Sequence, residues 1–303
     1  MNDRIARIGE LKAQKKALIL AHTYTRPEIQ DLADVVGDSF ELARRAAEAT
    51  AEIIVLAGVR FMGETAAILA PDKKVLLPEY GAGCPLADMI TPAQVRQLKN
   101  RHTGAAVVCY VNSSVEVKAL SDVCVTSSSA VHIVRNLPDQ EIIFIPDKNL
   151  GSWVAAQIPE KRFIFHEGYC PVHQQVKPEQ VRALKERHPE AVVLMHPECT
   201  DETRREADYI LSTSGMVNLV KEKRHTSYIV VTESGIIHAL QKHDPAARFI
   251  EITKPLLYCQ NMKKITLDSI LLALEEEESV VTVSGEIAAA ARYALTRMLE
   301  LNR

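Results

Sequence analysis

One unit of about 87 residues occurs three times along this 303-residue chain, and each copy ends at a cysteine. When residues 91–108 are shifted forward by 86 positions they align with residues 177–194, and ten of the 18 positions are identical. The same shift places Cys84 on Cys170, and a more diverged first copy aligns with the second after a shift of 88. Repeated units that close into a ring bring equivalent positions together, so the repeat predicts that its terminal cysteines face a common centre.

Each copy alternates short apolar strands with helices, which indicates a mainly parallel sheet covered on both faces. In the second copy we expect strands at 105–111, 141–145 and 162–165, and a helix at 126–136. The expected fold class is therefore α/β, formed by three homologous three-layer domains around a pseudo-threefold axis. The predicted boundaries are 1–85, 86–171 and 172–259, followed by a helical tail at 260–303 that packs on the first repeat.

Composition excludes several classes of function. The net charge of −3 gives no reason to expect nucleic acid or an anionic membrane surface as a partner. No apolar run approaches the ~18 residues of a membrane span, and the N-terminal segment lacks the apolar core of a signal peptide. We therefore expect a cytoplasmic protein, in which the six cysteines serve as buried thiols, metal ligands or catalytic groups and form no disulfides.

The three repeat-ending cysteines, Cys84, Cys170 and Cys259, are the candidate metal ligands. Three thiolates suit either a [4Fe–4S] cluster with one iron free of protein ligands or a zinc ion completed by His173. The sequence favours the cluster, and the absence of a CxxC pair argues against a classical zinc finger. The remaining cysteines align with Met, Ile and Ser in other copies, which is typical of core positions.

Two further sets of residues recur at equivalent positions. Polar residues follow the first strand of each unit, where ligands bind in open parallel sheets. Hydroxyl residues stand where a helix is expected to begin, and there they would cap the helix and border an anion site. The strand-end set is His22–Tyr24, Tyr110–Asn112 and His196–Glu198, and the hydroxyl set is Ser39, Ser127 and Thr213.

These groups predict Lewis-acid and acid–base chemistry on a small polyanion. Two alternatives stay open from the residues alone. One is another [4Fe–4S] hydro-lyase acting on a hydroxy-dicarboxylate, and the other is a zinc-stabilised protein that binds anions without catalysis.

The ordered motifs LAHTYTRPEIQDLADVVGDS, YVNSS, CPVHQ, HPEC, STSG and CQNMKK closely resemble those of the quinolinate synthase family, from about residue 15 onward. The resemblance implies three Rossmann-like domains and a [4Fe–4S] cluster held by the three cysteines. It also implies a transferase of NAD biosynthesis that condenses iminoaspartate (iminosuccinate) with dihydroxyacetone phosphate, releasing quinolinate, phosphate and two waters. An L-aspartate oxidase or dehydrogenase would supply the first substrate.

By the same resemblance, Tyr24 and Glu198 would move protons, with Tyr110 and His196 assisting. The implied substrate-binding residues are His22, Ser39, Tyr110, Val111, Asn112, Ser127, His196, Pro197, Glu198 and Thr213.

Overall fold

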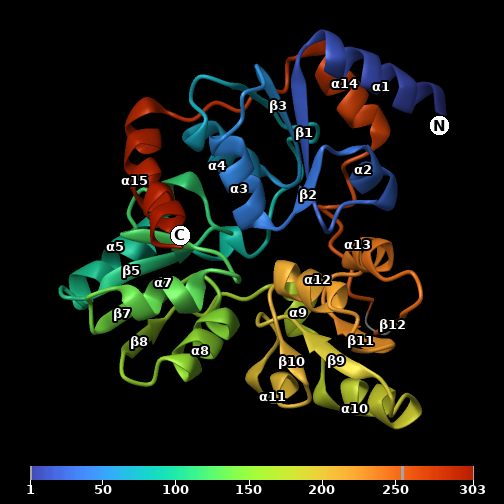
Figure 1. Ribbon diagram of the computed structural model, residues 1–303. Coiled ribbons are helices and arrows are strands. Elements are labelled where there is room, and N and C mark those ends of the chain that lie inside the picture. The colour runs from blue at the N-terminus through green and yellow to red at the C-terminus, as the bar shows by residue number, and fades with distance from the viewer. Residues whose placement is uncertain (1, 254–255, 303) are drawn as a thin grey trace.

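The computed structural model describes residues 2–253 and 256–302, and it contains three four-stranded sheets with the same strand order (Figure 1). In each sheet the unit's second strand lies at the edge, followed by its first, third and fourth strands, and all pairs are parallel. The orders are β2 (Val35–Gly37), β1 (Ala17–His22), β3 (Ile53–Ala57), β4 (Lys74–Leu76); β6 (Val123–Val125), β5 (Ala106–Tyr110), β7 (Glu141–Ile145), β8 (Arg162–Phe165); and β10 (Tyr209–Ile210), β9 (Val192–Met195), β11 (Ser227–Val231), β12 (Arg248–Glu251). The α/β class and the threefold repetition are confirmed.

Helices connect the strands of each sheet, and we call a sheet with its helices a unit. Because the central strands are apolar on both faces, as in the fully buried β3, each sheet needs a helical cover on both sides. The helices are α1 (Asn2–Gln14), α2 (Pro27–Leu32), α3 (Ser39–Ala47) and α4 (Arg60–Leu69) in the first unit; α5 (Pro92–Arg101), α6 (Val115–Lys118), α7 (Ala130–Asn136) and α8 (Lys148–Gln157) in the second; and α9 (Pro171–Gln174), α10 (Pro178–Arg187), α11 (Asp201–Arg204), α12 (Thr213–Lys221) and α13 (Ile236–His243) in the third. A short 3₁₀ turn, Ala87–Met89, joins the first two units.

Most predicted elements of the second unit lie where the sequence places them, with one correction. Residues 126–129 form a turn ahead of α7 and do not open the helix. The Thr126 backbone N–H donates to Ser129 Oγ at 2.9 Å, which holds the chain in that turn. Serine and threonine hydroxyls favour such local bonds over helix continuation.

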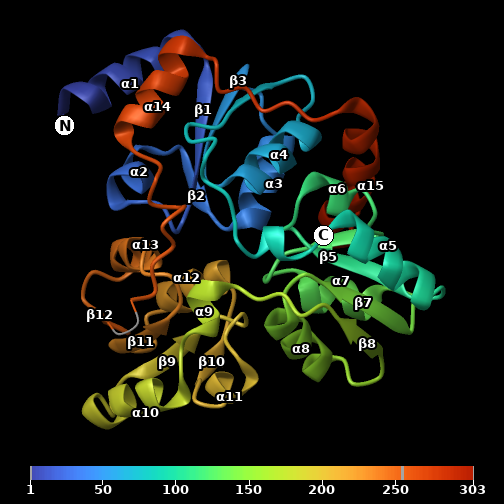
Figure 2. The ribbon, with the colours of Figure 1, turned by 180° about the vertical axis from the view of Figure 1, so that it is seen from behind.

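The C-terminal tail consists of α14 (Leu267–Glu276) and α15 (Gly285–Leu301). Helix α14 packs against α1 of the first unit, whereas α15 contacts α4 of the first unit and both α6 and β6 of the second (Figures 1 and 2). Arg292 Nε donates to Ile68 O at 2.9 Å and Arg297 Nη1 donates to Asp122 O at 2.8 Å. The tail therefore joins two units, whereas the sequence predicts packing on the first unit and gives no signal for the contact with the second.

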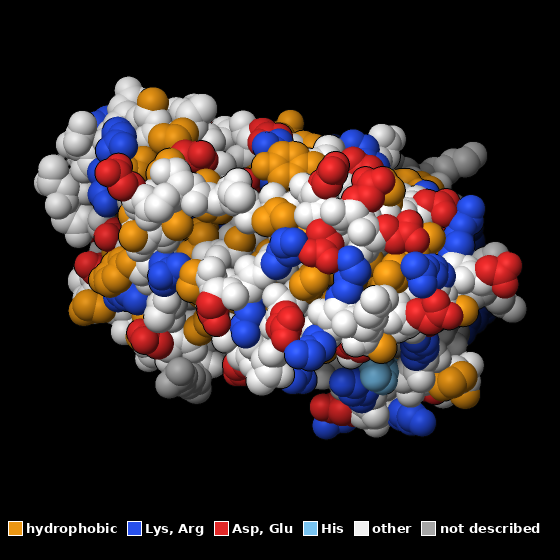
Figure 3. All heavy atoms as spheres, turned by 90° about the horizontal axis from the view of Figure 1, so that it is seen from above, with side chains coloured by type: hydrophobic (Ala, Val, Ile, Leu, Met, Phe, Trp, Pro, Cys, Tyr) orange, Lys and Arg blue, Asp and Glu red, His pale blue; other side chains and the backbone are white. Residues whose placement is uncertain are grey.

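The three units surround a common centre, seen from opposite sides in Figures 1 and 2. One buried apolar cluster runs through the first two units, the tail and part of the third, and a second cluster lies within the third unit. On the face shown in Figure 3, basic and acidic side chains are interspersed, in keeping with the small net charge. Among residues 2–253 and 256–302, no helix is both long and apolar enough to cross a bilayer.

Candidate active site

A cavity of about 370 Å³ lies where the three units meet, and each unit contributes to its wall. Because the strands within each sheet are parallel, the loops after them gather at one edge, where ligands bind in open α/β sheets. The predicted residues that line the cavity are His22, Tyr24, Ser39, Cys84, Tyr110, Asn112, Ser127, Cys170, His196, Glu198, Thr213 and Cys259.

Two predicted residues lie elsewhere. Val111 is 2% exposed and lines a small separate cavity beside Phe61. Pro197 presents its carbonyl to Arg204 Nη1 at 2.9 Å, away from the central cavity's lining. The resemblance therefore marks two residues whose side chains the structure does not bring to the cavity.

The strand-end histidines share one orientation. His22 ends β1, and its Nδ1 accepts a hydrogen bond from the Tyr24 backbone N–H at 3.1 Å. His196 follows β9, and its Nδ1 lies 3.4 Å from the Glu198 backbone N–H. Each Nδ1 is an acceptor, so a neutral ring carries its proton on Nε2. The Nε2 atom of His196 lies 3.2 Å from Ser127 Oγ, and both residues line the cavity.

Burial sets the charges of these groups. It lowers the pKa of His22 to about 4 and that of His196 to about 3, so both rings are neutral near pH 7. For Glu198, burial alone would raise the pKa, but the nearby His173 and His196 rings lower it well below its usual range. The cavity therefore holds the ionised Glu198 beside the neutral imidazoles of His22 and His196, which can donate or accept hydrogen bonds.

A continuous chain of hydrogen bonds links the third unit to Tyr24. Glu198 Oε2 lies 2.7 Å from His173 Nδ1, and His173 Nε2 lies 2.9 Å from Thr232 Oγ1. Thr232 Oγ1 in turn lies 2.7 Å from Tyr24 OH, which accepts from Thr213 Oγ1 at 3.0 Å. If His173 donates to the carboxylate, its Nε2 must accept from Thr232, which leaves Thr232 to accept from Tyr24. Protons can thus pass between two ionisable groups without leaving the protein.

The sequence does not single out Thr232. The residue one repeat earlier is Pro146, so the repeat gives no signal for it.

The hydroxyl residues at the helix starts differ from the prediction in one respect. Helices α3 and α12 begin at Ser39 and Thr213, but their caps are the preceding residues, Asp38 and Ser212. Ser127 lies in the turn before α7. The expectation that these hydroxyls cap the helices is wrong. The Thr213 hydroxyl is consequently free to donate to Tyr24.

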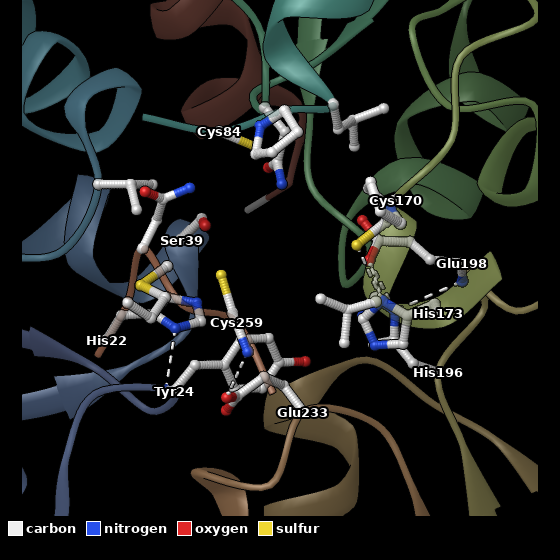
Figure 4. Close-up of a pocket in the computed structure, with 18 of the residues that line it drawn as sticks. His22, Tyr24, Ser39, Cys84, Cys170, His173, His196, Glu198, Glu233 and Cys259 are labelled. Carbon is white, nitrogen blue, oxygen red and sulfur yellow. Dashed lines mark hydrogen bonds and ion pairs between the residues drawn. The ribbon is translucent and has the colours of Figure 1, made fainter. Parts of the chain in front are cut away.

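The three repeat-ending cysteines line the same cavity from three units (Figure 4). They are free thiols of intermediate exposure, whereas the other three cysteines are fully buried, as core filling requires. Burial raises the pKa of Cys84 to about 12 and also raises the pKa values of Cys170 and Cys259. A bound cation would favour the thiolates and reverse this effect.

Two buried carboxylates support these cysteines, and the sequence reasoning missed them. Asp147 Oδ2 accepts from the Cys170 backbone N–H at 3.0 Å, and Glu233 Oε1 accepts from the Cys259 N–H at 3.0 Å. Glu233 stands 86 residues after Asp147, so the repeat itself carries the signal. The equivalent residue of the first unit is Val59, which has no carboxylate.

The donor set fits an iron–sulfur cluster. Thiolates are the usual ligands of such clusters, and three of them leave one iron without a protein ligand. His173 is grouped with Cys170 and Glu198, whose donor atoms lie within 4.8 Å of one another. Among the described residues, this group contains Cys170 but not Cys84 or Cys259.

Known proteins resemble this chain over nearly its whole length. A family model described as "Quinolinate synthetase A protein" matches residues 6–300. The quinolinate synthase of Caldicellulosiruptor saccharolyticus is 49% identical over 295 residues, which cover 97% of each chain. That of Alkaliphilus metalliredigens is 45% identical over 98% of each, and quinolinate synthase 2 of Methanosarcina acetivorans is 47% identical over 100% of this chain and 97% of its own. The cavity with its three cysteines thus lies in a chain that belongs to the quinolinate synthetase A family.

Proposed function

We propose that this chain is a quinolinate synthase that condenses iminoaspartate with dihydroxyacetone phosphate, giving quinolinate, phosphate and two waters. The observation that supports the proposal most directly is the meeting of three equivalent cysteines and two equivalent histidines in one cavity. Membership of the family supports this reaction, and the cavity contains groups that suit it.

Cys84, Cys170 and Cys259 would hold a [4Fe–4S] cluster. When bound, the cluster supplies a Lewis acid through the iron that lacks a protein ligand. The protein's own contribution is to bring three sulfurs, one from each unit, to the same cavity. Asp147 and Glu233 assist by fixing the backbone N–H of two of those cysteines.

The substrates carry two carboxylates and a phosphate, and the cavity offers donors for them. Ser39, Asn112 and Ser127 are polar groups on its wall, and α3 and α12 begin at that wall. Backbone N–H groups and the positive dipole end at a helix start favour anions. His22 and His196, neutral with Nε2–H donors, would hydrogen-bond carboxylate or phosphate oxygens without adding charge.

Proton transfer would centre on Tyr24 and Glu198, with Tyr110 and His196 close by. Glu198 is ionised, and none of the residues that the structure describes donates to its Oε1, so this oxygen is the one that can accept a proton. Burial raises the pKa of Tyr24 well above its ordinary value, so its hydroxyl keeps its proton and acts as an acid. Return of the proton from Glu198 to Tyr24 through His173 and Thr232 would restore both groups after each turnover, and it requires these two residues to reverse the donor directions given above.

The iminoaspartate substrate is the oxidation product of aspartate, which suggests an L-aspartate oxidase or dehydrogenase as upstream supplier. Both substrates are small water-soluble metabolites, and we propose that the enzyme works in the cytoplasm.

The test is an anaerobic assay in which purified protein is reconstituted with iron and sulfide and given both substrates. Quinolinate formation with release of one phosphate per product supports the proposal. Dehydration of hydroxy-dicarboxylates without quinolinate would instead identify another hydro-lyase. Zinc in colourless, anaerobically purified protein that binds anions without turnover would point to a binding protein.

A further inference from the structure

Three buried hydrogen-bond donors occupy equivalent positions in the three units. Lys118 lies 88 residues after Gln30 and 86 before Arg204, the two shifts that relate the repeats. The three residues lie on α2, α6 and α11, and none is more than 5% exposed. An amide, an ammonium and a guanidinium share a position, so the common property is the ability to donate hydrogen bonds from inside the protein.

Each donor reaches a carbonyl in a different unit, and the three carbonyls are also equivalent by the repeat. Lys118 Nζ donates to Phe61 O at 3.3 Å, and Arg204 Nη1 donates to Asn149 O at 2.7 Å. Gln30 Nε2 donates to Gly235 O at 2.9 Å. Phe61, Asn149 and Gly235 lie at the start of the helix that follows the third strand of their units.

The direction of the bonds is cyclic, because unit one bonds to unit three, unit three to unit two, and unit two to unit one. Two of the donors make additional bonds across the same boundary. Lys118 also reaches Thr65 Oγ1 at 3.1 Å, and Arg204 Nη2 reaches Ser152 Oγ at 2.9 Å. The donor positions, the acceptor positions and the direction of the bonds are all related by the repeat. Incidental packing would not produce the same arrangement at three boundaries.

The accepting segments are connected to the cysteines. Asp147, two residues before Asn149, caps α8 through the Leu150 N–H and also holds the Cys170 N–H. In the third unit Glu233 accepts from the N–H groups of Gly235 and Cys259.

The first unit makes this connection through its backbone. The Arg60 N–H, next to the acceptor Phe61, donates to Ala82 O at 2.8 Å, two residues before Cys84. At every boundary, therefore, the donor of one unit bonds a carbonyl whose residue is one or two positions from the residue that holds the neighbour's cysteine segment.

We propose that Gln30, Lys118 and Arg204 are positioning residues that form a cyclic clasp between the units and set the relative placement of the three cysteines. The clasp consists of these donors and the carbonyls of Phe61, Asn149 and Gly235. Lys118 bonds a carbonyl and a hydroxyl, and burial lowers its pKa. A buried cation satisfied in this way is costly to replace with a group that cannot donate, since its acceptors stay buried. This role does not depend on which reaction the cavity catalyses.

The test replaces each donor by methionine, which is similar in length but donates no hydrogen bond. Amide hydrogen exchange is then measured on the full chain. We expect exchange at the neighbour's accepting segment to rise roughly tenfold or more in Lys118→Met and Arg204→Met, whose donors are charged, and roughly threefold or more in Gln30→Met, whose donor is a neutral amide. The expected segments are 233–237 for Gln30→Met, 60–65 for Lys118→Met and 147–152 for Arg204→Met.

A matched control is Arg205→Met, because Arg205 directly follows Arg204 at the C-terminal end of α11, its side chain is 74% exposed, and among the described residues that side chain pairs with Asp201 alone. Arg204→Lys keeps a donor and should restore much of the protection at 147–152. After reconstitution, each methionine variant should also release iron to a chelator faster than the control.

Exchange that rises only on the mutated helix, or uniformly over the chain, would overturn the clasp. The clasp would also be overturned if the three methionine variants showed the same amide exchange and the same rate of iron release as Arg205→Met. If Arg204→Met fails to fold, the separate footprints of Gln30→Met and Lys118→Met and the behaviour of Arg204→Lys still decide the question.

Discussion

Acid should destabilise this protein through the neutral histidines of the cavity, and His22 allows the effect to be calculated. Its pKa is about 4 in the folded chain because the ring is buried, against 6.5 for an exposed histidine. The unfolded chain therefore binds more protons than the folded chain as the pH falls below 6.5. Stability is complete above that value and is lost progressively between about pH 6.5 and pH 4.

The size of the loss follows from these two values. At pH 5 the ring is almost fully protonated in the unfolded chain but only about one-tenth protonated in the folded chain, which costs about 2 kcal/mol relative to pH 7. His196, with a pKa of about 3, adds a loss of about the same size.

Urea unfolding of the metal-free protein, followed by the fluorescence of the single tryptophan, Trp153, measures this loss. In His22→Gln the decrease in unfolding free energy between pH 7 and pH 5 should be smaller than in the wild type by about 2 kcal/mol. His132→Gln, which changes an exposed ring on α7, should leave the decrease unchanged. If the unfolding free energy of His22→Gln falls between pH 7 and pH 5 by as much as that of the wild type, burial does not keep the His22 ring neutral.

Four further predictions concern the site and the core. Glu198→Gln should retain iron but lose roughly 100-fold or more in kcat, and wild-type turnover would remove this carboxylate from the mechanism. Thr232→Val should lower kcat by roughly tenfold or more with little change in KM, because it interrupts proton transfer, and an unchanged kcat would exclude that route. Iron analysis after anaerobic reconstitution should show loss of the cluster in Cys170→Ala but not in Cys109→Ala, and the reverse result would contradict the repeat. Ile54→Ala, in the centre of the first sheet, should reduce the unfolding free energy by about 2–5 kcal/mol in a urea titration, and a loss near zero would mean that this position is not tightly packed.

Much of the architecture could be predicted because the repeat supplies two kinds of information at once. The apolar runs that became β5 and β7 identify strands, and the aligned cysteines indicate that the units share a centre. Helix α5 begins at Pro92 after a capping Thr91, a local signal that needs no tertiary information.

The contacts between units could not be predicted in the same way. Thr232 and Tyr24 form a hydrogen bond although they are 208 residues apart, and no local sequence signal near either residue predicts this contact. The placement of α15 depends on how two units pack, because the helix contacts α4 of the first unit and both α6 and β6 of the second. Asp147 and Glu233 are a different case, since the repeat aligns them and only the structure shows that they bind cysteine N–H groups.

Val59, standing where the other units carry Asp147 and Glu233, has a consequence for substrate orientation. A ring of three identical walls would accept a small molecule equally well in three rotations. Val59 on the wall of the first unit and Glu233 on that of the third remove that degeneracy, as does the exchange of histidine for tyrosine between His22 and Tyr110. Because the three copies have diverged, the cavity can bind a small molecule in one preferred orientation. Any reaction that joins two unlike molecules requires such a preference.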